Sequence, residues 1–214
     1  MADLDKERIA AVALAVADER GVSGFTMRAV ADALGVTPMA LYHHVADKSE
    51  LVELVVDAAI SERPLPPATG HWQEDLWLLA NWERDSAHAH PTASQLLRLY
   101  AAWSPKMLHM EERWIGIWQQ SGLPLREALM AATASSLAIF GYVDNELRLH
   151  DIAPPDEAML AWLPNTRSLF TADLQPDTEF EVLVRGLIEG LHGQLQRLGD
   201  QAMPSTSVPA KASH

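Results

Sequence analysis

The 214-residue chain is predicted to be an all-α protein, and three features of the sequence support this prediction. Apolar residues recur at steps of three and four over several long stretches, which is the period of an amphipathic helix. Residues that cap helices stand where these stretches begin, and glycines or prolines stand where they end. No stretch alternates between apolar and polar residues as a half-buried strand would, and no hairpin signal competes.

The N-terminal residues 1–62 are predicted to form a small helical domain. An apolar stripe between Asp5 and Glu19 indicates a first helix that ends at Gly21. Residues 27–34 follow Thr26 as N-cap and stop at Gly35, with Val30, Ala33 and Leu34 as the inward face of that helix.

The third and fourth helices of this domain follow at once. Thr37 can cap, Pro38 suits the first helical position, and residues 39–45 supply about two turns. Asp47 and Glu50 form a pair like a capping box at the start of a longer fourth helix. Two short helices therefore flank a tight turn between Gly35 and Thr37.

Residues 63–70 contain three prolines and a glycine, and we place the domain boundary there. Residues 63–202 are predicted to form a second, larger helical domain, and residues 203–214, rich in small and polar residues, a flexible tail. The helical stretches expected in the second domain are 72–89, 92–103, 106–120, 125–150 and 178–199.

The segment GFTMRAVADALGVTPMALYHHVADK, residues 24–48, resembles the DNA-binding segment of the tetracycline-repressor (TetR) family in sequence, helix order and spacing. The resemblance extends over residues 5–60. Beyond Gly70 it is weaker, although AHPTASQLL and SGLPLREALMAA are similar to a tetracycline-repressor type of C-terminal domain. The resemblance implies a homodimeric regulator that binds double-stranded operator DNA and responds to a small-molecule effector.

The resemblance further implies that Thr26, Arg28, Tyr42 and Lys48 contact the DNA backbone or nearby bases. Residue chemistry supports this, because helix N-termini, a phenol and a guanidinium all suit phosphate. Leu41 and Val45 are needed for packing, so the outward face of the recognition helix is left to meet base edges in the major groove. The predicted DNA-binding residues are Thr26, Met27, Arg28, Thr37, Pro38, Met39, Tyr42, His43 and Lys48. Two alternatives remain open: Tyr42 could simply cap the small core, and His44 could help to hold the fourth helix.

Charge is the main argument against DNA binding. The net charge is −13, and residues 1–63 carry six Lys and Arg against eleven Asp and Glu. Between Gly21 and Lys48 the balance is even, with two basic and two acidic residues. Neutral donors also contact phosphate, so we expect DNA binding of only moderate salt sensitivity.

The second domain is rich in Trp and Met, which are typical of apolar ligand clefts between helices. The alternative is an ordinary core, because a stripe such as Met107, Met110 and Trp114 at helical spacing is also what core packing requires. Asn81, Tyr100 and His109 are the polar groups expected to orient a ligand. The predicted ligand-binding residues are Trp77, Asn81, Tyr100, Trp103, Met107, Met110, Trp114, Trp118 and Phe140.

Glycines in the last long helix point to dimerisation. Gly186, Gly190 and Gly193 each cost a helix roughly 1 kcal/mol relative to Ala, and close approach of another helix would offset that cost. An apolar seam runs beside these glycines, and the helix predicted over 125–150 likewise has small side chains, Ala and Ser, along one side. The resemblance implies a four-helix dimer interface from 125–150 and 178–199 of each subunit; packing within the chain alone is the alternative.

Other classes find no support in the sequence. The chain has no Cys, no GxSxG, no HExxH and no Gly-rich phosphate loop, so we expect neither an enzyme nor a cofactor. His88 and His90 are two residues apart and point to different sides of a helix, which argues against a metal site. Without a signal peptide or an apolar run of about 20 residues, we expect a cytoplasmic protein that is not in the membrane. A ligand-responsive repressor is the leading hypothesis, and a constitutive DNA-binding regulator that uses its second domain only to dimerise is the alternative.

Overall fold

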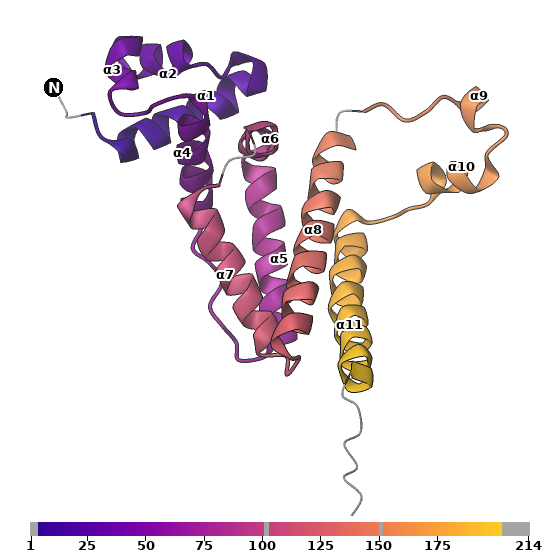
Figure 1. Ribbon diagram of the computed structural model, residues 1–214. Coiled ribbons are helices and arrows are strands. Elements are labelled where there is room, and N and C mark those ends of the chain that lie inside the picture. Colours follow the sequence, from indigo (N-terminus) through magenta and orange to yellow (C-terminus); the bar gives the residue numbers. More distant parts are fainter. Residues whose placement is uncertain (1–3, 101–102, 150–151, 203–214) are drawn as a thin grey trace, which may run out of the picture.

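The computed structural model describes residues 4–100, 103–149 and 152–202, and throughout these residues the chain is helical with no strand, as predicted. The expected flexible tail, 203–214, lies outside the described residues. Figure 1 shows the helices as two bundles with a smaller projecting segment. The helices are α1 (Lys6–Gly24), α2 (Met27–Leu34), α3 (Pro38–Tyr42), α4 (Lys48–Ser61), α5 (Trp72–Ala89), α6 (Pro91–Tyr100), α7 (Pro105–Gln119), α8 (Leu125–Leu149), α9 (Glu157–Leu160), α10 (Pro164–Thr171) and α11 (Pro176–Ala202).

The N-terminal bundle consists of α1 to α4 together with α6. Its core contains the fully buried Phe25, Leu41 and Leu51. Ala93 and Leu96 of α6 belong to this same core, so α6 packs with the first four helices although it follows the boundary predicted at residue 63. The chain therefore enters the C-terminal bundle with α5, returns to the N-terminal bundle with α6 and then completes the C-terminal bundle.

Short-range caps define the helices of the N-terminal bundle, as the sequence predicts. The Thr26 hydroxyl accepts the Ala29 N–H at 3.0 Å and the Thr37 hydroxyl accepts the Ala40 N–H at 3.2 Å. Gly35 ends α2 in the left-handed region at a φ of 71°, which is strained for a residue with a side chain. At the start of α4, Asp47 accepts the N–H groups of the two residues Ser49 and Glu50.

Three details of this bundle correct the sequence predictions. The recognition helix α3 covers only residues 38–42, because the His44 and Val45 N–H groups both donate to the Leu41 carbonyl and tighten the chain into a turn. The first helix leaves helical geometry at Gly21 as expected but resumes a turn that reaches Gly24. Ala33, expected to face inward, is exposed.

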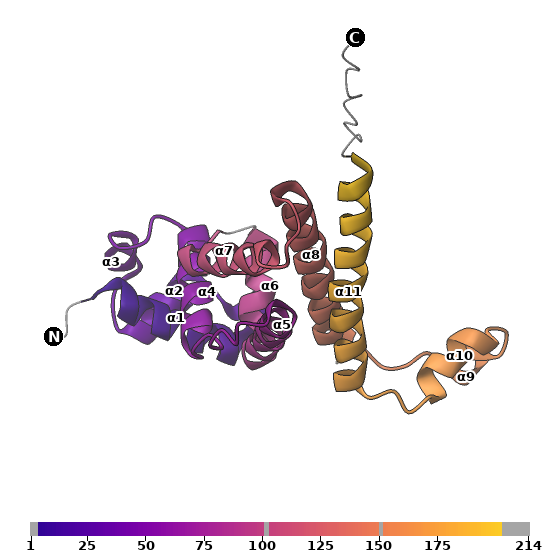
Figure 2. The same cartoon turned by 90° about the horizontal axis from the view of Figure 1, so that it is seen from below.

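The C-terminal bundle consists of α5, α7, α8 and α11. Its core includes Leu76, Trp118 and Phe180. Ser135 of α8 organises the centre, where its hydroxyl accepts the indole N–H groups of Trp114 and Trp118 at 3.1 and 3.0 Å. The helices α9 and α10 were not predicted; Figure 2 shows them projecting away from both bundles.

The seam predicted on the last helix is largely used within the chain. Phe180, Val184 and Leu195 are buried and belong to the core of the C-terminal bundle, where α11 packs on α8 and α5. None of the described helices is long and apolar enough to cross a membrane.

Candidate DNA-binding surface and ligand cavity

The short helix α3 offers an exposed face at one end of the molecule. The side chains of Met39 and Tyr42 are 67% and 47% exposed, whereas Leu41 and Val45 are buried beneath them. Thr37, Pro38 and His43 are also exposed on this segment. Figure 2 shows α3 at the far end from α8 and α11, where no other helix obstructs it. The structure therefore brings together the five residues predicted to meet base edges.

The predicted phosphate contacts lie on the neighbouring helix starts. Thr26 and Arg28 are exposed at the start of α2, and Arg28 lies 3.9 Å from the exposed Asp32. Met27 is only half-buried and packs against the core. Lys48 is half-buried, with its ammonium 5.5 Å from the ring centre of Phe25 and 5.2 Å from that of Tyr100. Lys48 thus lies where the start of α4 meets the end of α6.

The N-terminal bundle is held in shape by Glu50 of α4. Its carboxylate accepts the Ala46 N–H at 2.7 Å and pairs with Lys6 of α1 at 2.7 Å. The backbone hydrogen bond, followed by the Lys6 contact, lowers the pKa of Glu50 below its ordinary value. Asp47 therefore caps α4 as predicted, whereas Glu50 accepts the N–H of Ala46, one residue before the cap, and also ties α4 to α1.

The second candidate site is a cavity of about 490 Å³ between α4, α5, α6, α7 and α8. A space of this size suits a drug-sized molecule. Its wall is largely apolar and aromatic. Five of the residues predicted to bind a ligand line it: Trp103, Met107, Met110, Trp114 and Phe140.

Four predicted ligand residues lie outside the cavity. Trp118 is fully buried and packs on Trp72, with ring centres 5.5 Å apart. Trp77 faces α11, where it contacts the Phe180 ring and the Arg185 guanidinium. These two rings follow the same helical stripes as the cavity residues, but the packing of α11 turns them into core contacts.

The polar groups expected to orient a ligand also lie elsewhere. The Asn81 amide donates to the Trp77 carbonyl at 2.8 Å, one helical turn back on α5. The Tyr100 ring contacts the Lys48 ammonium, and His109 is exposed on α7 outside the cavity lining. None of these three residues lines the cavity.

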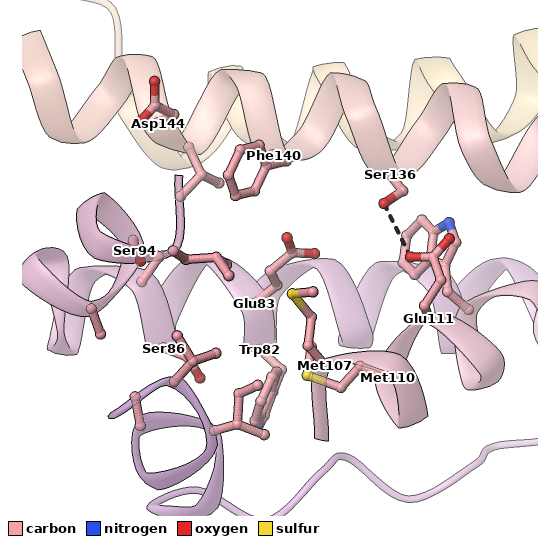
Figure 3. Close-up of a pocket in the computed structure, with 18 of the residues that line it drawn as sticks. Trp82, Glu83, Ser86, Ser94, Met107, Met110, Glu111, Ser136, Phe140 and Asp144 are labelled. Atoms are coloured by element: carbon pink, nitrogen blue, oxygen red, sulfur yellow. Dashed lines mark hydrogen bonds between the residues drawn. The ribbon is translucent and has the colours of Figure 1, made fainter. Parts of the chain in front are cut away.

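The polar groups that do face the cavity include two carboxylates that sequence reasoning missed. Glu83 of α5 and Glu111 of α7 both line it, and Ser136 of α8 donates to Glu111 at 3.4 Å (Figure 3). Burial, and then the charge of Glu111, raises the pKa of the Glu83 carboxyl to about 7. A signal existed, because Glu83 falls four residues after the buried Leu79, on the inward stripe of α5.

His90 connects the cavity with the N-terminal bundle. It lines the cavity at the end of α5, and its two ring nitrogens lie 2.9 Å from the Asp18 carboxylate of α1 and 3.0 Å from the Glu62 carboxylate that follows α4. Val56, Ala59 and Ile60 of α4 form part of the same cavity wall. One face of α4 thus belongs to the cavity, while its N-terminal end adjoins the recognition segment.

These features define a helix-turn-helix protein with a cavity between its helices. Residues 9–55 match the family model described as bacterial regulatory proteins, tetR family. An HTH-type transcriptional regulator of Saccharopolyspora erythraea is 28% identical over 144 residues, which are 67% of this chain and 61% of that protein. Tetracycline repressor protein class E of Escherichia coli is 25% identical over 200 residues, 91% of this chain and 94% of that protein. The family-model match and these curated relatives support a TetR-family transcriptional regulator.

Solved structures share the fold over nearly the whole chain. Apo ActR of Streptomyces coelicolor superposes with a TM-score of 0.75 at 24% identity, covering 92% of this chain and 99% of ActR. BioQ of Mycobacterium smegmatis superposes with a TM-score of 0.69 at 23% identity, covering 89% of this chain and 99% of BioQ. The chain spans 61% of the first regulator's length and 51% of that of a second relative, the repressor DrrR1 of Streptomyces coeruleorubidus.

Proposed function

We propose that the protein is a transcriptional repressor that binds palindromic operator DNA as a homodimer and releases it when a small apolar or aromatic effector enters the cavity. The observation that carries this proposal is that α4 belongs to both candidate sites. Its residues Val56, Ala59 and Ile60 line the cavity, and its N-terminal end lies beside the recognition segment. A ligand that changes the position of α4 would also change the position of α3. Ligand and DNA then antagonise each other by linkage.

Similar proteins support both halves of this proposal. One solved structure holds BioQ with its double-stranded DNA operator, and another holds ActR with actinorhodin. In the present chain Thr37, Met39 and His43 are exposed on and beside α3. The cavity favours a ligand-responsive regulator over a constitutive one, because a bundle that served only to dimerise would gain stability by filling such a space.

The dimer is proposed from surfaces that this subunit leaves uncovered. Leu125 and Leu137 of α8 are 62% and 70% exposed, and Val182 of α11 is 69% exposed. A Cβ added at Gly186 or Gly190 would meet nothing within 4 Å. Large apolar side chains beside open glycines fit a second copy packed through α8 and α11.

Operator geometry follows from this symmetry. A two-fold dimer presents two copies of α3, and each enters a major groove. The operator is therefore expected to be an inverted repeat with half-site centres about 34 to 36 Å apart, or a multiple of that spacing. Recovery of bound fragments from a random DNA pool by the purified full chain gives the operator directly. A pool without an enriched inverted repeat would contradict the proposed function.

The ligand half is tested on that operator. Apolar and aromatic compounds are titrated while intrinsic Trp fluorescence and operator retention are followed together, since Trp82, Trp103 and Trp114 line the cavity. Compounds that change the fluorescence should also release the operator. Ligands that bind with no change in operator affinity would leave only the constitutive regulator.

The dimer is tested by Gly190→Leu. Added bulk should overpack the interface at a cost of roughly 1 to 3 kcal/mol and weaken operator binding with it. Gly116→Leu on α7 is the matched control, because a Cβ there also meets nothing within 4 Å and the site lies outside α8 and α11. Sedimentation decides: a monomeric wild type at micromolar concentration contradicts the dimer, and an unchanged Gly190→Leu dimer removes Gly190 from it.

A further inference from the structure

The charged residues around the cavity are unevenly distributed by sign. Glu83, Glu111 and Asp144 supply three carboxylates to the lining, and His90 supplies an imidazole. No Lys or Arg is among the described residues that line it. With more acidic than basic groups in its lining, the cavity has a negative electrostatic potential. An apolar surrounding with little water screens that potential weakly.

Two of the four charged or titratable groups already have strong partners. Asp144 pairs with Arg98 of α6, and the His90 ring lies between Asp18 and Glu62. Arg84, the neighbour of Glu83 on α5, does not compensate it. Its guanidinium is directed to Glu146 at 2.5 Å and to Asp177 at 2.8 Å instead.

Glu83 and Glu111 are left without a cation. Within the part of the chain that the structure describes, Glu111 accepts only the 3.4 Å hydrogen bond from Ser136, and Glu83 has no hydrogen bond or ion pair. Figure 3 shows the Glu83 carboxylate rising from α5 into the space between Phe140 of α8 and the methionines of α7. When Glu83 is ionised, no cation in the described part of the chain pairs with it.

Two buried polar atoms in the same wall also lack partners. The Trp82 side chain is only 6% exposed, and neither its indole Nε1 nor the Ser86 Oγ has a hydrogen-bond partner among the described residues. Both residues line the cavity, one residue before and three residues after Glu83 on α5. Unsatisfied buried polar atoms are uncommon and often mark a place where a ligand or water completes the site.

We propose that the effector is an organic cation: a flat apolar body with a positively charged nitrogen that lies against Glu83 and Glu111. This inference rests on the proposed ligand site and names the chemistry of its occupant. The aromatic rings of Trp82, Trp103 and Phe140 and the sulfurs of Met107 and Met110 suit such a body, through cation–π and sulfur contacts. An anion would be repelled by both carboxylates, and a neutral molecule would leave them uncompensated.

Protonation of Glu83 gives the inference a pH dependence. The pKa of this carboxyl is raised to about 7, first by burial and then by Glu111, so the empty cavity holds it largely protonated below that pH. A bound cation favours the ionised form and releases a proton. Affinity for a permanent cation should therefore rise as pH increases from about 6 to about 8, by up to about tenfold. The groups facing this carboxyl from the surrounding helices are Glu111 of α7, Asp144 of α8, paired with Arg98 of α6, and His90 at the end of α5.

The test uses two probes of the same shape, 10-methylacridinium, which is permanently cationic, and 9-methylacridine, which is neutral at pH 8. Their heavy-atom counts match, so a difference in affinity reports charge. Calorimetric titration of the full-length dimer without DNA should show the cation binding about tenfold tighter or more. Glu83→Gln should abolish most of that preference and the pH dependence, while the affinity for 9-methylacridine stays the same.

Glu112→Gln is the matched control, because Glu112 is exposed on α7 beside Glu111 but outside the cavity lining. It should leave the charge preference intact. Equal binding of the two probes by the wild type, an unchanged preference in Glu83→Gln, or no binding of either probe would each overturn the inference. None of these outcomes touches the operator recovery experiment, so the proposed regulator can stand while its cationic effector fails.

Discussion

The two bundles differ in how completely their polar groups are paired. In the N-terminal bundle the caps Thr26, Thr37 and Asp47 satisfy N–H groups two or three residues away, and Glu50 is held by Ala46 and Lys6. In the C-terminal bundle Ser135 satisfies two indoles in the core, yet the neighbouring cavity leaves other polar atoms unpaired.

This difference suits the roles proposed for the two bundles, a recognition element and a sensor. A surface that must fit DNA benefits from a rigid support whose hydrogen bonds are complete without the partner. A sensor must bind its ligand more tightly in one conformation than in the other. Polar groups that lack hydrogen-bond partners without the ligand can provide this difference in binding free energy. The structure follows both requirements, with α4 belonging to each region.

The largest effect expected from this comparison is at Leu41. Leu41→Ala removes a fully buried side chain beneath the recognition face, and such truncations cost about 2 to 5 kcal/mol. Operator binding should be lost. All seven Trp residues lie beyond residue 70, so Trp fluorescence reports the C-terminal bundle and should keep its native emission if the bundles are separable.

The reciprocal variant is Leu76→Ala, which truncates a fully buried side chain in the other core at a similar cost. It should change Trp emission and lower the midpoint of urea unfolding followed by that signal. If Leu41→Ala altered the emission as strongly as Leu76→Ala, the two bundles would be one cooperative unit and the proposed domain division would fail.

The next effect is at Glu83 and depends on pH. Its carboxyl ionises near 4.5 when unfolded and near 7 when folded, so between these values the unfolded chain has lost a proton that the folded chain keeps. Stability therefore falls as pH rises through this window. Glu83→Gln removes the penalty and should be more stable than wild type by about 1 to 3 kcal/mol at pH 8, and about equal at pH 4. Urea unfolding at the two pH values measures it; a constant difference would mean that the raised pKa is not the cause.

The same contrast explains what the sequence could predict. The caps of α2, α3 and α4, the break at Gly21 and the exposed Met39 and Tyr42 depend on residues within one or two turns of each other. Local patterns carry that information. The length of α3 was overestimated because the turn after Tyr42 is set by how Val45 packs into the core, which no local propensity reveals.

The cavity could be predicted only in part because five helices, α4 to α8, assemble it, and its lining residues extend from Val56 to Leu147 in the sequence. Met107, Met110 and Trp114 could be found from spacing on α7, whereas Trp77 and Trp118 follow equally good stripes and are covered by other helices. Which stripe faces a cavity is decided by the packing of α11 and α8. A charged residue on an inward stripe, as at Glu83, is the better sequence signal, since charge in a filled core would be excluded.

A smaller effect is expected at Tyr42. Tyr42→Phe should weaken operator binding by about 1 kcal/mol, because one phosphate hydrogen bond is lost while the ring keeps its place. Nonspecific DNA should be weakened equally, since a phosphate contact carries no sequence information. Fluorescence anisotropy with both DNAs measures the two losses, and unchanged affinity for both would leave Tyr42 as a packing residue only.

The smallest effect is expected at Met39, and it concerns preference rather than affinity. The Met39 side chain is 67% exposed on α3 and apolar, so its use on DNA would be contact with a thymine methyl, worth about 0.8 kcal/mol per buried methylene-sized group. Met39→Ala should reduce the preference for thymine at one position of each half-site and leave nonspecific affinity unchanged. His43→Ala should relax a different position, because His43 can hydrogen-bond a base edge. Selection from a random pool with each variant shows which positions change. If both variants recover the wild-type site, then the exposed face of α3 does not meet the bases, and the N-terminal bundle would be presenting another surface to DNA.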